Sequence, residues 1–429
     1  MKNRASLYFL FSLFLAAAGC YRSTPAEPMV GIQIQDRNGM TETLSTPERL
    51  ELYENVDFLS SQPYKKVLRV YKKEGKNQAK ITTYHPNGSV WQYLEAQEMR
   101  AQGAYREWYP NGQLRIEANV IGGTADVSQG SQQDWLFDGL SRVWDEQGNL
   151  MAKIPYFKGN LDGLSIYYYS SGQIAKEVPY FKNSIEGEVL EFTIDGKLKS
   201  NTKYKKGNKE GASLGYFPNG QAAWIEEHTD GLLLTGSYFT SKGDLCAEVE
   251  NGGGFQAVFD GESLVYLVEF RNGQPEGRVQ KYLPSGELLL SYRVKGGKKQ
   301  GEEIEYYTAA DRKDGGNQPL PKLSVNWNEN AIHGTVKTWY NNGQLQSQRD
   351  FCRNQKLGPS VSWYQDGSLM MVEEYEEDLL VKGQYFKKNQ RDPVSSIVNG
   401  TGTAYLFDDQ GIFLRKVNYL KGKPIDPEN

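Results

Sequence analysis

The sequence predicts an all-β fold made of serial antiparallel hairpins, and three observations support this prediction. The 429 residues include 45 Gly and 28 Tyr but are only 38% hydrophobic, which is typical of many short strands and turns. Glycines recur at steps of 24 residues along much of the chain. Aromatic residues keep fixed offsets from these glycines, as side chains on one face of a strand would.

The same composition excludes several classes of protein. A mean hydropathy of -0.64 excludes a polytopic membrane protein. An aromatic content of 12% is too high for a mostly disordered chain. The net charge of -4 provides no basic footprint, so no nucleic-acid partner is expected.

The first element along the chain is an export signal. Two basic residues precede an apolar stretch over residues 7–15, and small residues then lead to Cys20. The stretch is too short for a stable membrane span. The ending resembles a bacterial lipobox, although Ala17 stands where that motif favours Leu. The resemblance implies a lipoprotein signal peptide over residues 1–19 and lipid attachment at Cys20.

The residues after this cysteine indicate where the protein is sorted and predict a tether. Tyr21 stands where an Asp would retain a Gram-negative lipoprotein in the inner membrane, so the resemblance implies sorting to the outer membrane. Residues 20–28 are polar and contain Pro, which predicts a tether. We therefore expect an exported protein that a lipid anchors to the cell envelope.

A mixed lead-in is expected over residues 29–75, before a repeat array over residues 76–429. Thr46 and Pro47 suit the cap and the first position of a short helix within the lead-in.

Two glycine series define the repeat, and steps of 24 residues recur within both. The turn glycine of each repeat is taken as position zero. The first series contains Gly88, Gly112, Gly148, Gly172, Gly196, Gly220, Gly343 and Gly367, and the second contains Gly139, Gly163, Gly187, Gly211, Gly277, Gly301, Gly334 and Gly358. Two registers at one period identify a repeat protein.

Aromatic residues at position -4 are expected to be structural. They share even parity with an apolar residue at +2 and a frequent aromatic residue at +8, which predicts one common, covered face of the sheet. The -4 aromatics are Tyr84, Trp108, Trp144, Tyr168, Phe192, Tyr216, Tyr282, Trp339, Trp363 and Phe407.

Aromatic residues at position -3 are the candidate binding residues. Their odd position predicts that they project from the other, otherwise polar face, where clustered exposed aromatics mark contact sites. The alternative is that they are ordinary exposed strand residues. They are Tyr109, Tyr169, Phe217, Tyr340 and Tyr364.

The repeat tip predicts the register of each hairpin. In the tip at residues 110–112, Pro suits the first turn position and Gly112 suits the left-handed conformation. A three-residue loop with a glycine bulge pairs position -3 with +1 and position -4 with +2. Trp108 should therefore lie across from Leu114, a pair that stabilises the sheet by roughly 0.2–1 kcal/mol.

The second glycine series carries a resemblance to a known family. Tyr156 is followed by Gly at three and seven residues, and Tyr204 repeats this spacing. The pattern resembles MORN repeats, specifically the bacterial variant of proteins labelled YwqK-type antitoxins. The resemblance covers about residues 80–425, although residues 236–276 and 383–400 match poorly. It implies an elongated, curved, open antiparallel sheet that contacts proteins or membranes, and it implies no activity.

Two insertions interrupt the period, near residues 123–134 and 309–321. They should leave opposite long edges of the sheet. Long loops on a repeat scaffold are frequently functional, and a tolerated surface insertion is the alternative.

The sequence carries no recognisable catalytic or metal-binding motif. The three His residues lie far apart, and the acidic cluster at residues 373–378 lacks the spacing of a calcium loop. We therefore expect no enzyme, no cofactor and no metal. Cys246 and Cys352 are expected to stay unpaired, because too many strands separate them in an open array.

The predicted function is that of a non-catalytic protein-binding scaffold on a membrane-anchored envelope lipoprotein. The expected partners are the membrane, through the N-terminal lipid, and another protein. Two alternatives remain open. One is an antitoxin or immunity protein that neutralises a toxin. The other is a binder of cell-wall glycan or choline through Trp–Tyr pairs. No oligomeric state follows from the sequence.

Overall fold

The computed structural model describes residues 28–313, 315–316 and 318–425, so the expected signal peptide, Cys20 and nearly all of the tether lie outside it. The chain forms two compact units. Unit 1 runs to Asn149 and includes Tyr156–Asn160, and unit 2 contains Leu150–Pro155 and Leu161–Asn429. None of the helices in the described residues is long and apolar enough to cross a bilayer.

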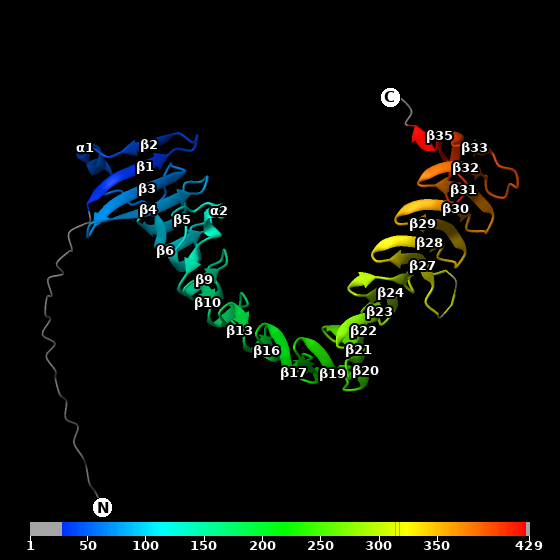
Figure 1. The fold of residues 1–429 in the computed structure, drawn as a ribbon, viewed down its shortest axis with the longest axis horizontal. Helices are drawn as coiled ribbons and strands as arrows, with labels where there is room; N and C mark the ends of the chain where they lie inside the picture. Colours follow the sequence, from blue (N-terminus) through cyan, green and yellow to red (C-terminus); the bar gives the residue numbers. More distant parts are fainter. Residues whose placement is uncertain (1–27, 314, 317, 426–429) are drawn as a thin grey trace, which may run out of the picture. The chain divides into compact units, whose positions relative to one another are not determined.

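Unit 1 is an antiparallel sheet with a short helical segment between its second and third strands (Figure 1). Its elements are β1 (Met29–Gln35), β2 (Thr41–Leu44), α1 (Pro47–Leu50), η1 (Glu51–Tyr53), β3 (Lys66–Lys73), β4 (Lys76–Tyr84), β5 (Val90–Gln97), β6 (Arg100–Trp108), β7 (Leu114–Gly122), α2 (Gln129–Gln132), β8 (Leu136–Phe137) and β9 (Gly139–Trp144). Strand β1 lies between β2 and β3, and each later strand up to β7 pairs with the one before it. The sheet therefore begins inside the segment that was expected to be a mixed lead-in.

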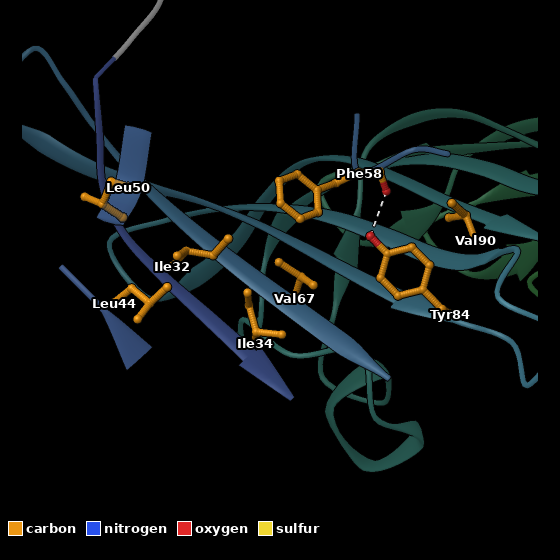
Figure 2. Close-up of a cluster of buried hydrophobic side chains, with 8 residues drawn as sticks. All are labelled: Ile32, Ile34, Leu44, Leu50, Phe58, Val67, Tyr84 and Val90. Atoms are coloured by element: carbon orange, nitrogen blue, oxygen red, sulfur yellow. Dashed lines mark hydrogen bonds between the residues drawn. The ribbon is translucent and has the colours of Figure 1, made fainter. Parts of the chain in front are cut away.

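The lead-in closes one end of the sheet with its own core (Figure 2). Leu50 on α1 and Phe58 after η1 are buried with Ile32 and Val67 of the first strands. The Tyr84 hydroxyl donates a hydrogen bond to the Phe58 carbonyl at 2.9 Å. The helix begins at its Pro, as predicted, although the side chain of its capping Thr makes no hydrogen bond.

Unit 2 continues the hairpin pattern. Its strands are β10 (Leu150–Phe157), β11 (Asn160–Leu161), β12 (Gly163–Tyr168), β13 (Ile174–Phe181), β14 (Ser184–Ile185), β15 (Gly187–Phe192), β16 (Leu198–Lys205), β17 (Asn208–Tyr216), β18 (Ala222–Thr229), β19 (Leu232–Phe239), β20 (Leu245–Glu250), β21 (Gly253–Asp260), β22 (Ser263–Arg271), β23 (Gln274–Tyr282), β24 (Leu288–Lys295), β25 (Lys298–Lys299), β26 (Gly301–Tyr306), β27 (Pro321–Asn328), β28 (Ala331–Trp339), β29 (Leu345–Cys352), β30 (Gln355–Trp363), β31 (Leu369–Glu376), β32 (Leu379–Tyr385), β33 (Ser395–Val398), β34 (Thr401–Phe407), β35 (Phe413–Leu420) and β36 (Lys423–Ile425). The long strands pair antiparallel with their neighbours in chain order. Among the strands described in each unit, none pairs back to close the sheet on itself. The predicted all-β fold of serial antiparallel hairpins is confirmed.

The predicted tip geometry is confirmed. The Tyr109 amide donates to the Gln113 carbonyl at 2.9 Å, which closes a three-residue loop. Gly112 has a φ of 86°, in the left-handed region that favours glycine. Trp108 lies opposite Leu114, and Trp339 lies opposite Leu345.

A bulge beside each tip changes which residues share a face. Glu107 pairs with Ile116 but Trp108 pairs with Leu114, so Arg115 is an extra residue in β7. One extra residue moves the following side chains to the other face. Positions -4 and +2 therefore lie on one face, called here the open face. Positions -3, -5, -7, +4, +6 and +8 lie on the other, called here the packed face. The expectation that +8 shares a face with -4 is wrong.

The two segments that match the repeat poorly belong to copies of one local structure. In the first copy, three between-repeat turns are joined by backbone hydrogen bonds. Leu233 donates to Gly273 at 3.2 Å, and Gly273 donates to Gly252 at 2.9 Å. The equivalent residues in the second copy are Leu380, Gly422 and Gly400. We call each such group a three-turn cluster.

The first insertion is part of the core of unit 1. Trp135 and Val127 are buried against Tyr105, and the Trp135 indole donates to the Thr124 carbonyl at 2.9 Å. The second insertion is mostly exposed, and it reaches the next tip where the Asn341 amide donates to the Asp311 carbonyl at 3.0 Å.

The two cysteines that the structure describes, Cys246 and Cys352, are free thiols, as predicted.

Candidate binding surfaces

The -3 aromatics join successive repeats. The Tyr340 hydroxyl donates to the Trp363 carbonyl at 2.9 Å, and the Tyr364 hydroxyl donates to the Phe386 carbonyl at 2.8 Å. The same bond links Tyr109 to Trp144 at 3.0 Å and Tyr169 to Phe192 at 2.8 Å. Each ring therefore spans to the backbone of the following hairpin.

The expected exposure of the -3 aromatics is wrong. Tyr364, Phe217 and Tyr340 are 0%, 3% and 7% exposed, while Tyr109 and Tyr169 are half-buried. The physical reason is the bulge in the strand after the tip, which puts positions +4, +6 and +8 on the same face as position -3 and so makes that face the packed one. This burial raises the pKa of Tyr364 to about 12. The geometry thus gives these residues a structural role and removes the basis for treating them as a contact surface.

The -4 aromatics are less covered than expected. Tyr84 is buried, but Trp108, Trp144, Trp339 and Trp363 are half-buried on the open face. The same holds for the remaining members of the set, Tyr168, Phe192, Tyr216, Tyr282 and Phe407. Each pairs across the hairpin with an apolar +2 residue where the register is given, so the row is structural and also part of an accessible surface.

The tip asparagines form a link that the sequence prediction missed. The side-chain oxygen Oδ1 of Asn111 accepts from the Gln113 backbone amide at 3.0 Å, which supports its own turn. Its side-chain nitrogen donates to the Glu146 carbonyl at 2.8 Å, in the next tip. Asn87, Asn219 and Asn342 make equivalent bonds to the tips that follow them. The repeated Asn-Gly dipeptide was interpreted only as a turn signal. Its recurrence at the repeat period was the feature that could have indicated a link between successive tips.

Two carboxylates are buried on the packed face of unit 2. Glu373 accepts hydrogen bonds from Tyr385 at 2.8 Å and Tyr375 at 3.1 Å. Glu226, in the corresponding place of the first copy, accepts from Tyr238 at 2.7 Å. Burial, with the nearby carboxylate as a second cause, raises the pKa of Tyr238 and of Tyr385. Hydrogen-bonded tyrosines satisfy both carboxylates, which indicates a structural role.

The histidines have separate environments. His85 occupies a -3 position, and its Nε2 lies 2.9 Å from the Trp108 carbonyl, so it replaces a tyrosine in the inter-repeat link. His228 is buried beside Glu226, and burial lowers its pKa. His333 is exposed. Within the described part of the chain, no group of three or more His, Cys, Asp and Glu residues is arranged to hold a metal ion.

An apolar surface lies on the open face of unit 2. Leu164, Phe181 and Leu198 are 45%, 55% and 36% exposed. Around Glu177, which lies opposite Ile166 and Leu190, half-buried apolar residues occupy the same face of β12 to β16, namely Ile166, Tyr168, Ile174, Pro179, Leu190 and Phe192. We call these nine residues the open-face patch. The open face of β28 and β29 is polar by comparison, with Thr335 hydrogen-bonded to Asp350 at 2.7 Å.

A comparison with protein-family models matches the tip hairpin of the repeat. The MORN repeat variant matches residues 101–121, 161–183 and 332–352. Each match contains one tip hairpin together with its -3 tyrosine, at Tyr109, Tyr169 and Tyr340. A search of curated proteins finds no match to this chain. The matches and the serial hairpins together support a MORN-repeat protein, and therefore a repeat scaffold.

Proposed function

We propose that this chain is a lipid-anchored protein of the cell envelope whose repeats form a non-catalytic scaffold for another protein. The open-face patch is the observation that carries the binding proposal. Contiguous exposed apolar surface on a soluble repeat marks a contact site more often than scattered single residues do. The packed face offers no such surface, because its aromatics are used between repeats.

The patch indicates the chemistry of the partner. Tyr168 faces Ile174 and Phe192 faces Leu198 across two hairpins, which produces an apolar row over four strands. Charges of both signs flank it, because Lys182 and Glu188 are both exposed, and the Lys182 ammonium lies 5.2 Å from the centre of the Phe181 ring. An apolar anchor with a mixed polar rim is the complementary surface.

The anchoring proposal rests on the sequence of the first twenty residues. Two acyl chains at Cys20 would hold the protein on a membrane where a single chain would be marginal. Cys20→Ser should move the protein from the membrane fraction to the soluble fraction and remove the lipid mass. A variant that stays membrane-bound and unmodified like the wild type would remove this part of the proposal.

The binding proposal is tested by crosslinking the native lipoprotein in cells and capturing its partners. Phe181→Ser combined with Leu198→Ser should reduce the captured partner at least tenfold. Ile412→Ser is the matched control, since Ile412 is 64% exposed and lies outside the patch. Equal capture by the wild type, the double variant and the control would refute the open-face patch as the contact site. If instead the patch binds protein-free vesicles and the double variant does not, the contact is with a membrane.

Two other functions remain candidates at the level of the whole chain. Neutralisation of a toxin would use the same scaffold and would appear as a toxin among the captured partners. Binding of cell-wall glycan or choline through the tip Trp–Tyr pairs loses support, because Tyr340 and Tyr364 are buried and Tyr109 is half-buried between repeats.

A further inference from the structure

We propose that unit 1 contains a separate groove that binds a neutral oligosaccharide. The groove has a volume of about 1050 Å³ and lies over strands β3 to β6. Its wall is the segment that follows α1, with Tyr53, Val56 and Phe58. It is formed by the lead-in rather than by the repeats, and it is independent of the open-face patch in unit 2.

The floor of the groove carries amide side chains that have no hydrogen-bond partner among the residues that the structure describes. Gln78 and Gln97 lie directly opposite each other on β4 and β5 and are half-buried. Neither side chain makes a hydrogen bond to any described residue, and the same holds for Gln102 and Asn55 at the rim. Half-buried amides without partners lose free energy unless water or a ligand satisfies them. The two half-buried glutamines, with the exposed amides of Gln102 and Asn55 at the rim, indicate a ligand rich in hydrogen-bonding groups.

The charged groups of the groove balance each other. Two lysines and two glutamates line it. The Lys80 ammonium lies 5.1 Å from the centre of the Tyr71 ring. Both oxygens of Glu95 are engaged, by the Tyr93 hydroxyl at 2.9 Å and the Ala104 amide at 3.0 Å. Because the charges are balanced and partly engaged, the groove favours an uncharged ligand over an anion or a cation.

Gly103 leaves room for the hydrogen-bonded carboxylate of Glu95. A Cβ at Gly103 would stand 2.4 Å from a Glu95 oxygen, and its φ of 119° is one that other residues rarely adopt. Glu95 therefore folds over the β6 backbone at Gly103 and Ala104. With both oxygens already bonded, Glu95 is a structural residue of the groove floor rather than a general acid.

The side chains match a sugar better than a peptide. The floor is the face of paired strands, whose backbone groups bond to each other, so recognition must come from side chains. An amide offers both donors and an acceptor, as a sugar hydroxyl does. Tyr53 and Tyr71 supply ring surface for the apolar faces of pyranose rings. The volume is at the upper end of ordinary ligand pockets, which suits several sugar units rather than one.

The test measures binding of defined probes to the full-length protein in detergent by isothermal titration calorimetry. The probes are the N-acetylglucosamine hexamer, maltohexaose and an uncharged Gly-Ser peptide of similar length. We expect at least one hexasaccharide to bind and the peptide not to bind. Gln78→Leu with Gln97→Leu should weaken binding at least tenfold, because the shape is kept while the amides are lost.

The matched control is Gln147→Leu, which removes an exposed tip amide of unit 1 outside the groove. It should change the affinity less than twofold. Thermal unfolding of the double variant should equal that of the wild type, since neither glutamine side chain bonds to any residue in the described part of the chain. Absence of binding to both hexasaccharides, equal binding by the double variant, or tighter binding of the peptide would each overturn the proposal. None of these results would affect the open-face patch.

Discussion

Trp363 and Tyr364 are neighbours in sequence, but their side chains lie on opposite faces of the sheet. Trp363 pairs with Leu369 on the open face and is half-buried. Tyr364 is 0% exposed and bonds to the next hairpin. The sequence predicted the reverse ranking of the two positions, because counting parity cannot reveal the bulge at Met370 in the partner strand.

The first prediction follows from this ranking. Tyr364→Ala should lower the free energy of unfolding by about 3–5 kcal/mol, as truncation of a buried aromatic residue does. Trp363→Ala should have a smaller effect because half of its environment is already solvent. Urea unfolding of both variants measures the difference. A larger loss for Trp363→Ala would indicate instead that the -4 aromatic contributes more to stability than the -3 aromatic, as the sequence had predicted.

The second prediction concerns alkaline pH. Burial raises the pKa of Tyr364 from 10.0 to about 12. The folded protein therefore keeps the phenol proton where the unfolded chain releases it, so the stability contributed below pH 10 is lost as pH rises toward 12. Tyr364→Phe should be about 1 kcal/mol less stable at neutral pH, through the lost hydrogen bond. It should also show a shallower decline above pH 10. An identical alkaline slope would contradict the raised pKa.

At the scale of elements, the hairpin tips act as links as well as turns. Asn111→Asp keeps the acceptor for the Gln113 amide but removes the donor to Glu146. We expect a loss of about 1 kcal/mol in the free energy of unfolding of unit 1. Asn38→Asp, at an exposed turn without such a link, is the control. If both variants lose the same amount, the tips stabilise only their own turns.

A glycine beside the second three-turn cluster is strongly constrained. Gly402 follows Gly400 by two residues, has a φ of 149°, and a Cβ there would stand 2.4 Å from the Ser396 carbonyl oxygen. Gly243 is also left-handed, but nothing lies within 4 Å of its Cβ position. Gly402→Ala should therefore destabilise unit 2 clearly more than Gly243→Ala, because strain and a backbone clash add. Thermal unfolding compares the two, and equal losses would show that the close approach relaxes freely.

What the sequence could predict at this scale depended on local signals. The tip register followed from Gly112 and its neighbours, since turn geometry is encoded within a few residues. The place of Trp135 in the core could not be predicted, because its contacts with Tyr105 depend on how an insertion folds back onto the sheet. The groove was missed for a similar reason. Gln78 and Gln97 become neighbours only through strand pairing, and the wall comes from a segment without periodicity.

At the scale of the whole molecule, the period of the sequence was sufficient to predict the fold class. Each long strand pairs with its chain neighbours, so a repeat visible in sequence is also the unit of structure. The two poorly matching segments were not recognised as copies of one structure, because each was compared only with the repeat consensus. Both copies bond a tyrosine to a buried glutamate of a preceding strand, Tyr238 to Glu226 and Tyr385 to Glu373.

The last prediction tests whether these two copies act independently. Tyr238→Phe and Tyr385→Phe each remove one hydrogen bond to a buried carboxylate, and each should lower the free energy of unfolding by about 1.5–3 kcal/mol. Because the copies share no strand pairing, the double variant should show the sum of the single losses within about 0.5 kcal/mol. Denaturant unfolding of the four proteins, wild type included, completes the cycle. A coupling above about 1 kcal/mol would mean that stability in unit 2 is shared over many hairpins rather than carried by neighbours.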